Sequence, residues 1–364
     1  MSDRLDQLCI NTIRTLAMDA VQKADSGHPG MPMGAADMAY VLWTRFLKHN
    51  PVDPTWPDRD RFVLSAGHGS MLLYSLLHLT GYDLSLEELE NFRQLNSRTP
   101  GHPEYGSTPG VEATTGPLGQ GFAIGVGLAI AERFLAATFN HPQFPIFDHF
   151  TYVLVSDGDL MEGVSHEAAA LAGQLGLGKL ICLYDDNDIS IEGSTDITFT
   201  EDIPAIFRAC GWRVWEVDGH ALAEIESAVR EAQNETSHPS LIVCHTHIGY
   251  GSPNKQDSAA SHGAPLGERE VQLTKEALGW PANAHFLVPP EAQALFRRAV
   301  EQGEEAQSHW REMFARYTAA YPQEADILER LRAGGLPDGW EEALPSFSCA
   351  DGPMPTRNAS GAAL

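Results

Sequence analysis

The sequence predicts an α/β fold in which a parallel β-sheet is flanked by helices on both faces. Short, predominantly apolar segments typical of buried strands occur at 151–155, 180–184, 213–217 and 241–245. Helical patterns lie between these strands, at 163–177, 204–210 and 221–233. Strands that alternate with helices in this way form a parallel sheet, because each connecting helix packs back onto a face of the sheet.

The first third of the chain predicts helices around one further strand. Residues 5–21 place apolar side chains close to the helical period, and a second helix is expected at 33–47. A short strand candidate at 61–65 is followed by an apolar helix at 71–80. Residues 116–137 form an Ala-rich helical run whose glycines allow close approach to another backbone or to a ligand.

The last third divides into charged helix and linker. Residues 268–331 are mostly charged and helical in pattern, whereas the chain from Gly334 onward is rich in Gly, Pro and Ser. We therefore expect one large domain at 1–330 and a linker at 331–364.

Charge excludes one broad class of function. The chain carries 24 basic and 49 acidic side chains, a formal net charge of −25, so it repels nucleic-acid backbones and needs a local device to hold any phosphate. No transmembrane run or signal-peptide core is expected from the sequence. The five scattered cysteines form no CxxC pair, which favours a reducing, cytoplasmic location.

Polar residues follow two of the predicted strands. Asp157 and Asn187 are 30 positions apart, one strand–helix–strand unit, so we expect them to face each other beyond the carboxyl ends of the strands. Carboxylate, amide and carbonyl oxygens suit Mg²⁺ or Ca²⁺, and such a cation would offset the repulsion of phosphate. Gly158 and a helix beginning near Gly163 would offer N–H groups to a diphosphate. The alternative is that Asp157 and Asp185 only cap helices or form turns.

Histidines in glycine- or proline-containing loops are the second candidate feature. Such loops present an imidazole for proton transfer near neutral pH, although any single one of them can equally be an ordinary surface residue. A zinc hydrolase is disfavoured because the sequence has no HExxH motif and no CxxC pair. The four histidines in question are His28, His68, His102 and His262.

These residues make the chain resemble the transketolase family, specifically its N-terminal, diphosphate-binding half with the thiamine-diphosphate-binding fold. The resemblance runs from about Leu5 to the last residues and consists of several independent motifs in the family's order. The motifs are Ser26–Gly34, Leu64–Ser70, Thr99–Glu104, Thr115–Gly121, Asp157-Gly158 through Asn187, Ile248–Lys255 and Ser261–Gly267.

The resemblance implies a role for each matching residue. The metal, Mg²⁺ or Ca²⁺, is expected at Asp157, Asn187 and the backbone carbonyl of Ile189. The substrate channel is expected to be lined by His28, His102 and His262, which would bond sugar hydroxyls and assist proton transfer. Leu118 is expected to support the bent shape of the cofactor, and Glu162 resembles a carboxylate that couples paired active sites. Contacts with thiamine diphosphate are implied for His68, Gly116, Leu118, Gly158, Glu162, Asn187 and His262.

Three features depart from the family's pattern. Ser156 replaces the first glycine of a Gly-Asp-Gly triplet, and because serine is small we expect the replacement to be tolerated, with some weakening of metal affinity. Residues 256–260 also differ near His262. The chain also stops at a segment, 355–361, that resembles the connection into a pyrimidine-binding domain. The family's cofactor-activating carboxylate lies in that following domain.

The resemblance implies transfer of a two-carbon ketol unit from a ketose phosphate to an aldose phosphate. This chain would supply the diphosphate half, need a pyrimidine domain for full activity, and assemble as a homo- or hetero-oligomer through an exposed apolar surface. Dihydroxyacetone synthase is an alternative, and phosphoketolase and deoxyxylulose phosphate synthase are more distant ones. A truncated, non-catalytic module that binds cofactor or a partner is the alternative from another class.

Overall fold

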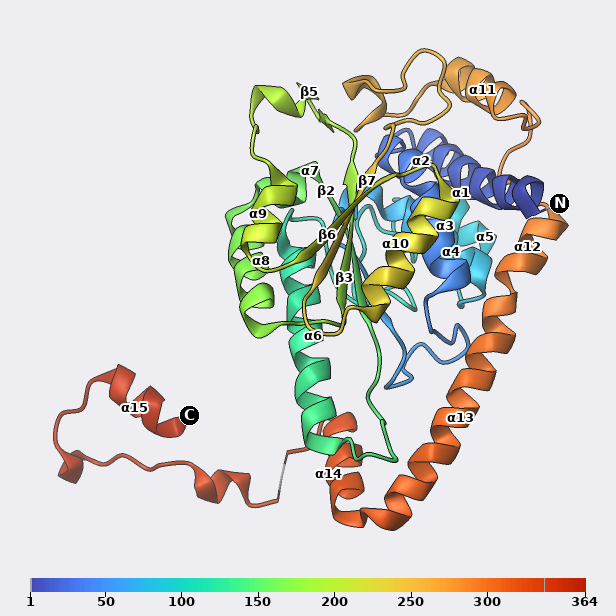
Figure 1. Cartoon of the computed structure of the whole chain (residues 1–364). Coiled ribbons are helices and arrows are strands. Elements are labelled where there is room, and N and C mark those ends of the chain that lie inside the picture. The colour runs from blue at the N-terminus through green and yellow to red at the C-terminus, as the bar shows by residue number, and fades with distance from the viewer. Residues whose placement is uncertain (1, 337) are drawn as a thin grey trace. The chain divides into compact units, whose positions relative to one another are not determined.

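The computed structural model describes residues 2–336 and 338–364, so Met1 and Pro337 of the predicted domain and linker lie outside the described residues. The chain divides into two compact units, one ending at Trp310 and one running from Arg311 to Leu364. The first unit (Figure 1) contains helices α1 (Ser2–Ala24), α2 (Gly30–Gly34), α3 (Ala36–Arg45), α4 (Ser70–Thr80), α5 (Leu86–Glu90), α6 (Gln120–Phe139), α7 (Asp157–Met161), α8 (Gly163–Leu175), α9 (Ile203–Ala209), α10 (Leu222–Asn234), α11 (Glu268–Ala277) and α12 (Pro290–Phe296).

A five-stranded sheet forms the centre of the first unit, in the order β1-β2-β3-β7-β6. Every neighbouring pair of strands is parallel, as the alternation of strands and helices predicts. A separate antiparallel hairpin pairs β4 (Ile189–Ser190) with β5 (Gly193–Ser194). The strands of the main sheet are β1 (Arg61–Leu64), β2 (Thr151–Ser156), β3 (Leu180–Asp186), β6 (Arg213–Asp218) and β7 (Ser240–His245).

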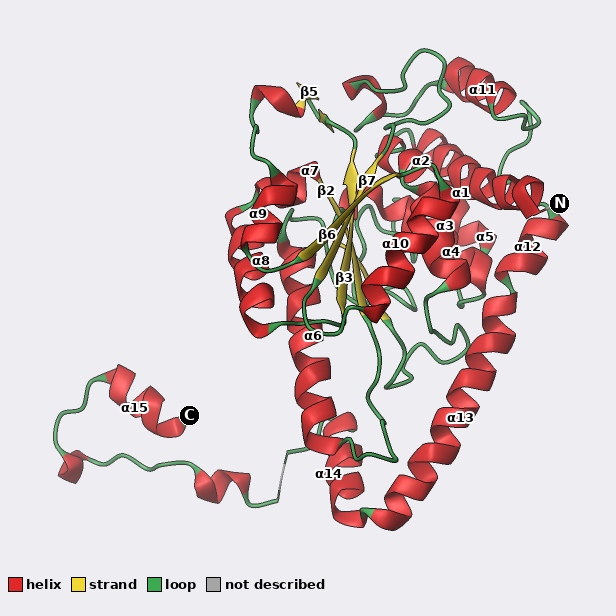
Figure 2. Ribbon diagram, viewed as in Figure 1, coloured by secondary structure: helices red, strands yellow, loops and turns green. Residues whose placement is uncertain are grey.

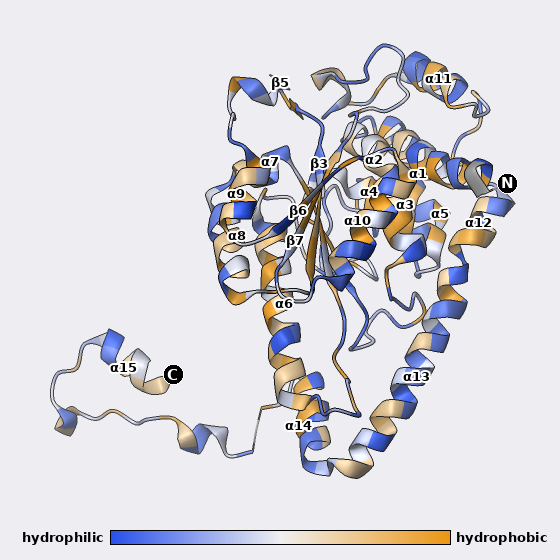
Figure 3. Ribbon diagram, in the orientation of Figure 1, coloured by the Kyte–Doolittle hydropathy of each residue, from blue (hydrophilic) through white to orange (hydrophobic). Residues whose placement is uncertain are grey.

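Helices cover both faces of this sheet, and each face has its own apolar core (Figure 2). Leu154 and Leu183 pack on the face covered by α1, α3, α4 and α10, whereas Val153 and Cys182 pack against α6, α8 and α9. Figure 3 shows many hydrophobic residues in the strands between these helices, with hydrophilic ones in β6. Full burial of one such aliphatic side chain stabilises the fold by roughly 1.5–3 kcal/mol.

Helix α6 packs against the sheet through two of its glycines, Gly121 and Gly125. By length and composition alone it is the one helix among the described residues that is able to cross a membrane. In the structure, however, a Cβ atom added at Gly121 would lie 2.5 Å from the Ser65 Cα, and one added at Gly125 would clash with the side chain of Val153. The glycines therefore let the helix lie directly on the sheet.

Several elements differ from the sequence prediction. The helix expected at 33–47 is divided near Ala35 into α2, which begins earlier than predicted, at Gly30, and α3. At this division a Cβ atom on Gly34 would lie 2.8 Å from a carbonyl oxygen of another loop. Helix α7 begins directly at Asp157, before the predicted helix α8. In the second unit, the linker predicted at 331–364 contains a terminal helix, α15 (Thr356–Ala363). Helix α14 (Pro322–Arg332) precedes it, and α13 (Arg298–Ala320) spans the division between the units.

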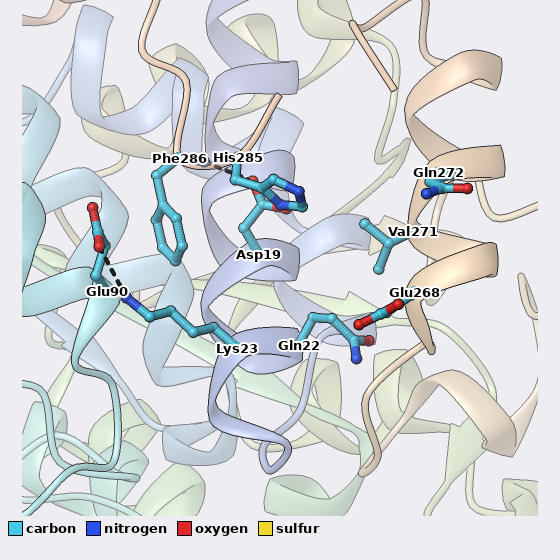
Figure 4. Close-up of a pocket in the computed structure, with 9 residues that line it drawn as sticks. All are labelled: Asp19, Gln22, Lys23, Glu90, Glu268, Val271, Gln272, His285 and Phe286. Atoms are coloured by element: carbon cyan, nitrogen blue, oxygen red, sulfur yellow. Dashed lines mark hydrogen bonds and ion pairs between the residues drawn. The ribbon is translucent and has the colours of Figure 1, made fainter. Parts of the chain in front are cut away.

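A buried ion pair between Lys275 and Asp19 connects α11 with α1. The Lys275 ammonium donates to Asp19 Oδ1 at 2.5 Å and to the Ala284 carbonyl at 2.5 Å, and the Lys275 side chain is fully buried. The other oxygen of Asp19 accepts the N–H of Phe286 at 2.9 Å. Figure 4 shows Asp19 beside Phe286 and, nearby, the more exposed pair of Lys23 with Glu90.

We expect Lys275→Met to destabilise the chain by about 3–5 kcal/mol, because it leaves the Asp19 carboxylate buried without its cation. The measurement is the free energy of urea unfolding. Lys23→Met is the matched control, since removal of that partly exposed pair is expected to change stability by less than about 1 kcal/mol. Equal losses in the two variants would contradict the importance of the buried pair.

Candidate active site

The predicted metal ligands meet at the carboxyl edge of the sheet. β2 and β3 are neighbours, and the backbone N–H of Asn187 lies 3.5 Å from Asp157 Oδ2. The hydroxyl of Tyr184 donates to Asp157 Oδ1 at 2.7 Å. Both predicted ligands are largely buried, with 6% of Asp157 and 8% of Asn187 exposed. The register of the parallel strands thus brings together residues that are 30 positions apart.

The Asn187 amide has a fixed orientation. Its Nδ2 donates to Asp185 Oδ2 at 2.9 Å, and Asp185 Oδ1 accepts the Thr246 hydroxyl at 2.5 Å. The amide oxygen therefore faces the other way, where it accepts the N–H of Ile189 at 3.1 Å. Asp188 lies between Asn187 and Ile189 in the sequence and adopts a φ of 59°, which turns the backbone toward β4.

Negative charge is concentrated at this edge. Burial raises the pKa of Asp157 to about 7, and the carboxylates of Asp186 and Asp185 add to the effect. Burial likewise raises the pKa of Asp185 to about 6. A divalent cation favours the ionised form of nearby carboxylates, and the oxygen donors of Asp157 and Asn187 suit Mg²⁺ or Ca²⁺. Among the described residues, no group of three or more His, Cys, Asp or Glu side chains is arranged to hold a metal, so a cation here needs the amide oxygen as well.

The four histidines gather in one cluster although they lie in loops far apart in the sequence. The ring centre of His28 is 5.2 Å from that of His68, 5.7 Å from that of His262 and 6.5 Å from that of His102. His68 and His262 stack, with ring centres 5.2 Å apart and planes 16° from parallel. The structure thus brings the four candidate histidines side by side, and the roles that the resemblance implies for them stay predictions.

Glycines allow the loops that carry the histidines to touch through their backbones. A Cβ atom at Gly30 would lie 2.5 Å from the Ser261 carbonyl oxygen, and one at Gly34 would lie 2.8 Å from the His247 carbonyl oxygen. A Cβ atom at Gly67 would lie 2.6 Å from the Gly116 nitrogen. Side chains at these positions would push the histidines apart.

The clustered histidines are neutral near pH 7. Burial lowers the pKa of His28 to about 4, with further effects from His262, Arg93 and His102. Burial also lowers the pKa of His68, His102 and His262. The Nδ1 atoms of His28 and His262 are buried and have no hydrogen-bond partner among the described residues. Unpaired buried nitrogens of this kind suit a polar ligand.

Gly116, Leu118 and Gly158 lie between the histidines and the metal ligands. A Cβ atom at Gly116 would lie 3.0 Å from the His102 ring, and one at Gly158 would lie 3.0 Å from Leu118 Cδ1. Gly158 also lies in the first turn of α7, directly after Asp157. The small residues, the oxygen donors and the unpaired histidine nitrogens together fit a diphosphate-bearing cofactor with its cation.

Glu162 lies at the margin of this arrangement. A Cβ atom at Gly119 would lie 2.8 Å from the Glu162 Cβ, but the Glu162 side chain itself is exposed. A separate cavity of about 640 Å³ beside Asp19 and Gln22 shares no lining residue with the cluster of histidines (Figure 4).

Sequence reasoning missed three neighbours of the site. Tyr184 and Asp185 stand at the end of an apolar strand pattern, so their hydrogen bonds to the predicted ligands were not visible in the sequence. Ile191 is 62% exposed, yet a Cβ atom at Gly263 would lie 3.6 Å from its Cδ1. Only the position of Asp185 directly after a strand could have indicated its place.

Comparisons with known proteins agree with the geometry. The family model described as transketolase, thiamine diphosphate binding domain, matches residues 5–337. A transketolase of Halalkalibacterium halodurans is 58% identical over 365 residues, covering 100% of this chain and 54% of that protein. Transketolase 2 of Escherichia coli is 60% identical over 338 residues, covering 93% and 50% respectively.

Solved structures show the same fold. A Pichia stipitis transketolase in complex with sedoheptulose-7-phosphate has a TM-score of 0.95 and 47% identity, covering 99% of this chain and 53% of that one. The transketolase of Leishmania mexicana has a TM-score of 0.92 and 50% identity, covering 94% and 51%. The chain spans about half the length of the curated relatives it matches. It therefore belongs to the transketolase family and carries that family's thiamine diphosphate binding domain.

Proposed function

We propose that this chain is the diphosphate- and metal-binding half of an enzyme that transfers a two-carbon ketol unit from a ketose phosphate to an aldose phosphate. The observations that carry this proposal are the contact between Asp157 and Asn187 and the cluster of histidines. Segment 116–118 links the two, because Leu118 lies against Gly158 and Gly116 lies against the ring of His102. The family membership supports it, since both curated relatives named above are transketolases.

The residues have separate parts in holding the cofactor. Asp157, the oriented amide of Asn187 and the carbonyl of Ile189 would hold Mg²⁺, or Ca²⁺ in its place. Gly158 and His68 would contact the diphosphate, and Gly116 and Leu118 would support the remainder of the molecule. Thiamine diphosphate, when bound, supplies the carbon centre that carries the two-carbon unit, whereas the protein supplies binding and orientation.

The histidines would act on the sugar. A neutral imidazole has one N–H donor and one acceptor nitrogen, so His28, His102 and His262 can bond hydroxyl groups and move a proton to or from them. Desolvation lowers the pKa of all three, although His28 and His262 are only partly buried and His102 is exposed, and this favours the neutral form, which needs no counter-ion. Glu162 would act at the interface between paired sites, because its side chain is exposed.

A complete enzyme would need a pyrimidine domain, from another chain or another segment, and an assembly of two or more chains. We retain residues 331–364 as a linker toward that domain. The five cysteines are free in the structure, which supports the cytoplasm as the proposed compartment. A dihydroxyacetone synthase would use the same half, and acceptor profiling separates it from a transketolase.

A non-catalytic binding module is the second candidate. Such a module would bind thiamine diphosphate and metal but would turn nothing over with any partner. The complementation measurement below distinguishes the two.

We expect Asp157→Asn to weaken binding of thiamine diphosphate in the presence of Mg²⁺ by at least about 100-fold, roughly 2.7 kcal/mol. The substitution keeps the shape of the side chain but replaces one carboxylate oxygen with an NH₂ group, so the negative charge that attracts a cation is lost. Isothermal titration calorimetry measures the affinity. Asp60→Asn is the control, because Asp60 is also a buried carboxylate but precedes β1 at the opposite edge of the sheet. Equal affinity in Asp157→Asn and wild type would exclude Asp157 as a ligand.

The purified chain is expected to show no turnover of hydroxypyruvate with ribose 5-phosphate when thiamine diphosphate and Mg²⁺ are in excess. Adding the remaining half of Escherichia coli transketolase 2 as a second chain should produce turnover, and Asp157→Asn should abolish it. Turnover by the chain alone would contradict the need for a second half. Failure of every tested partner half, with cofactor binding intact, would favour the non-catalytic module.

Stability should fall in acid because of His28. Its folded-state pKa of about 4 lies below the ordinary value of about 6.5, so the unfolded chain takes up the proton first as the pH falls from 6.5 toward 4. The free energy of unfolding should therefore fall between pH 7.5 and pH 5 by about 1–2 kcal/mol less in His28→Asn than in wild type. Urea unfolding at the two pH values measures it, with the exposed His309→Asn as control. An identical pH dependence in His28→Asn and wild type would rule out this contribution.

A further inference from the structure

Asp159 is a buried carboxylate that the proposed chemistry does not use. It lies in α7, two residues after the metal ligand Asp157, and its side chain is fully shielded from solvent. A buried carboxylate is costly unless hydrogen bonds satisfy it. Its bonding partners therefore indicate why the position is acidic.

The two oxygens of Asp159 bond three separate segments. Oδ1 accepts the Ser65 hydroxyl at 2.7 Å and the Gly119 N–H at 2.8 Å. Oδ2 accepts the N–H of Ser156 at 3.0 Å and its hydroxyl at 3.4 Å. The Ser65 hydroxyl in turn accepts the N–H of Phe122 at 2.9 Å. One carboxylate thus joins the end of β1, the start of α6 and the end of β2.

A purely local role does not explain these bonds. Capping of α7 requires only the bonds to Ser156, three residues away, whereas Ser65 and Gly119 lie 94 and 40 residues away in sequence. Gly119 has a φ of 76°, so the backbone turns sharply there between Leu118 and α6. Its N–H is held by Asp159 at the point where the segment with Gly116 and Leu118 ends.

We propose that Asp159 is a positioning residue that holds segment 116–119 against the end of β2, so that the cofactor-binding segment and the metal ligand Asp157 are assembled before a ligand binds. This inference rests on the proposed function for its consequence, the binding of thiamine diphosphate. The hydrogen bond between Asp159 and Gly119 is present in the ligand-free chain, so its effect is measurable without any ligand.

Asparagine cannot replace the carboxylate in this position. All the groups that face Asp159 are donors, namely two backbone N–H groups and two hydroxyls, so both side-chain oxygens must accept. An amide offers one oxygen, and its NH₂ group would face the N–H of either Gly119 or Ser156. The bond that is lost leaves a buried donor unsatisfied, which loosens one of the joined segments.

The test compares Asp159→Asn with Asp60→Asn. Asp60 is also buried and accepts two backbone N–H groups, from Lys48 and Phe150, both at 2.8 Å, but it lies before β1 at the other edge of the sheet. Hydrogen exchange followed by mass spectrometry reports on peptides that cover residues 117–123 in the ligand-free chains. Calorimetry with thiamine diphosphate and Mg²⁺ reports on binding, and thermal unfolding reports on overall stability.

In Asp159→Asn we expect exchange at 117–123 to be at least tenfold faster and the cofactor affinity to fall by about 10–100-fold. In Asp60→Asn we expect a similar loss of thermal stability, with both of these readouts as in wild type. Ser65→Ala serves if Asp159→Asn does not fold; it removes one donor and leaves the carboxylate, and it also removes the acceptor of the Phe122 N–H. Exchange in this variant is therefore read only on peptides that end before Phe122, where the same change is expected in smaller degree.

Unchanged exchange at 117–123 in Asp159→Asn, or before Phe122 in Ser65→Ala, would overturn the proposal. So would equal losses of affinity in Asp159→Asn and Asp60→Asn, because the effect would then follow stability alone. A wild-type chain that binds no thiamine diphosphate contradicts the proposed function instead, and the exchange measurement still decides whether Asp159 holds the segment.

Discussion

The parallel direction of all five main strands is the constraint on which the rest of the structure depends. Because the strands point the same way, their carboxyl ends share one edge, and Asp157 and Asn187 meet there through the pairing of β2 with β3. Neighbouring carboxylates accumulate for the same reason, since Asp185 and Asp186 end β3. A fold with a net charge of −25 thus concentrates acid at the place where a diphosphate would have to bind. The cation proposed at Asp157 and Asn187 would offset this charge.

The histidine cluster depends on a different constraint. Loops that are distant in the sequence meet there, and the rings that they carry are uncharged. His28 follows α1, His68 follows β1, and His262 lies after β7. Their loops meet through backbone contacts at Gly30 and Gly67. His28 and His68 are partly shielded from water there, and this shielding lowers the pKa of each and favours the neutral form. The positions of the proposed metal ligands are therefore set by strand register, and those of the histidines by close backbone contact.

Much of this arrangement was predictable from the sequence, but not all of it. Apolar runs such as 151–155 indicate buried strands, and the spacing of Asp157 and Asn187 follows from one crossover unit. The transketolase resemblance supplied the residue roles, which periodicity alone does not give. Hydrogen-bond partners such as Tyr184 and Asp159 were not predictable, because a side chain's partner depends on tertiary packing. The domain boundary at 330 likewise stays a prediction, since the compact units divide after Trp310.

The glycine contacts also have a consequence for protein engineering. At Gly30, Gly34 and Gly67, any added carbon would meet the backbone of another loop, and a backbone cannot rotate away as a side chain can. Libraries intended to change sugar preference should leave these three positions unvaried and place diversity at the side chains that the loops present. Segment 256–260, which departs from the family's pattern, is a natural site for such variation.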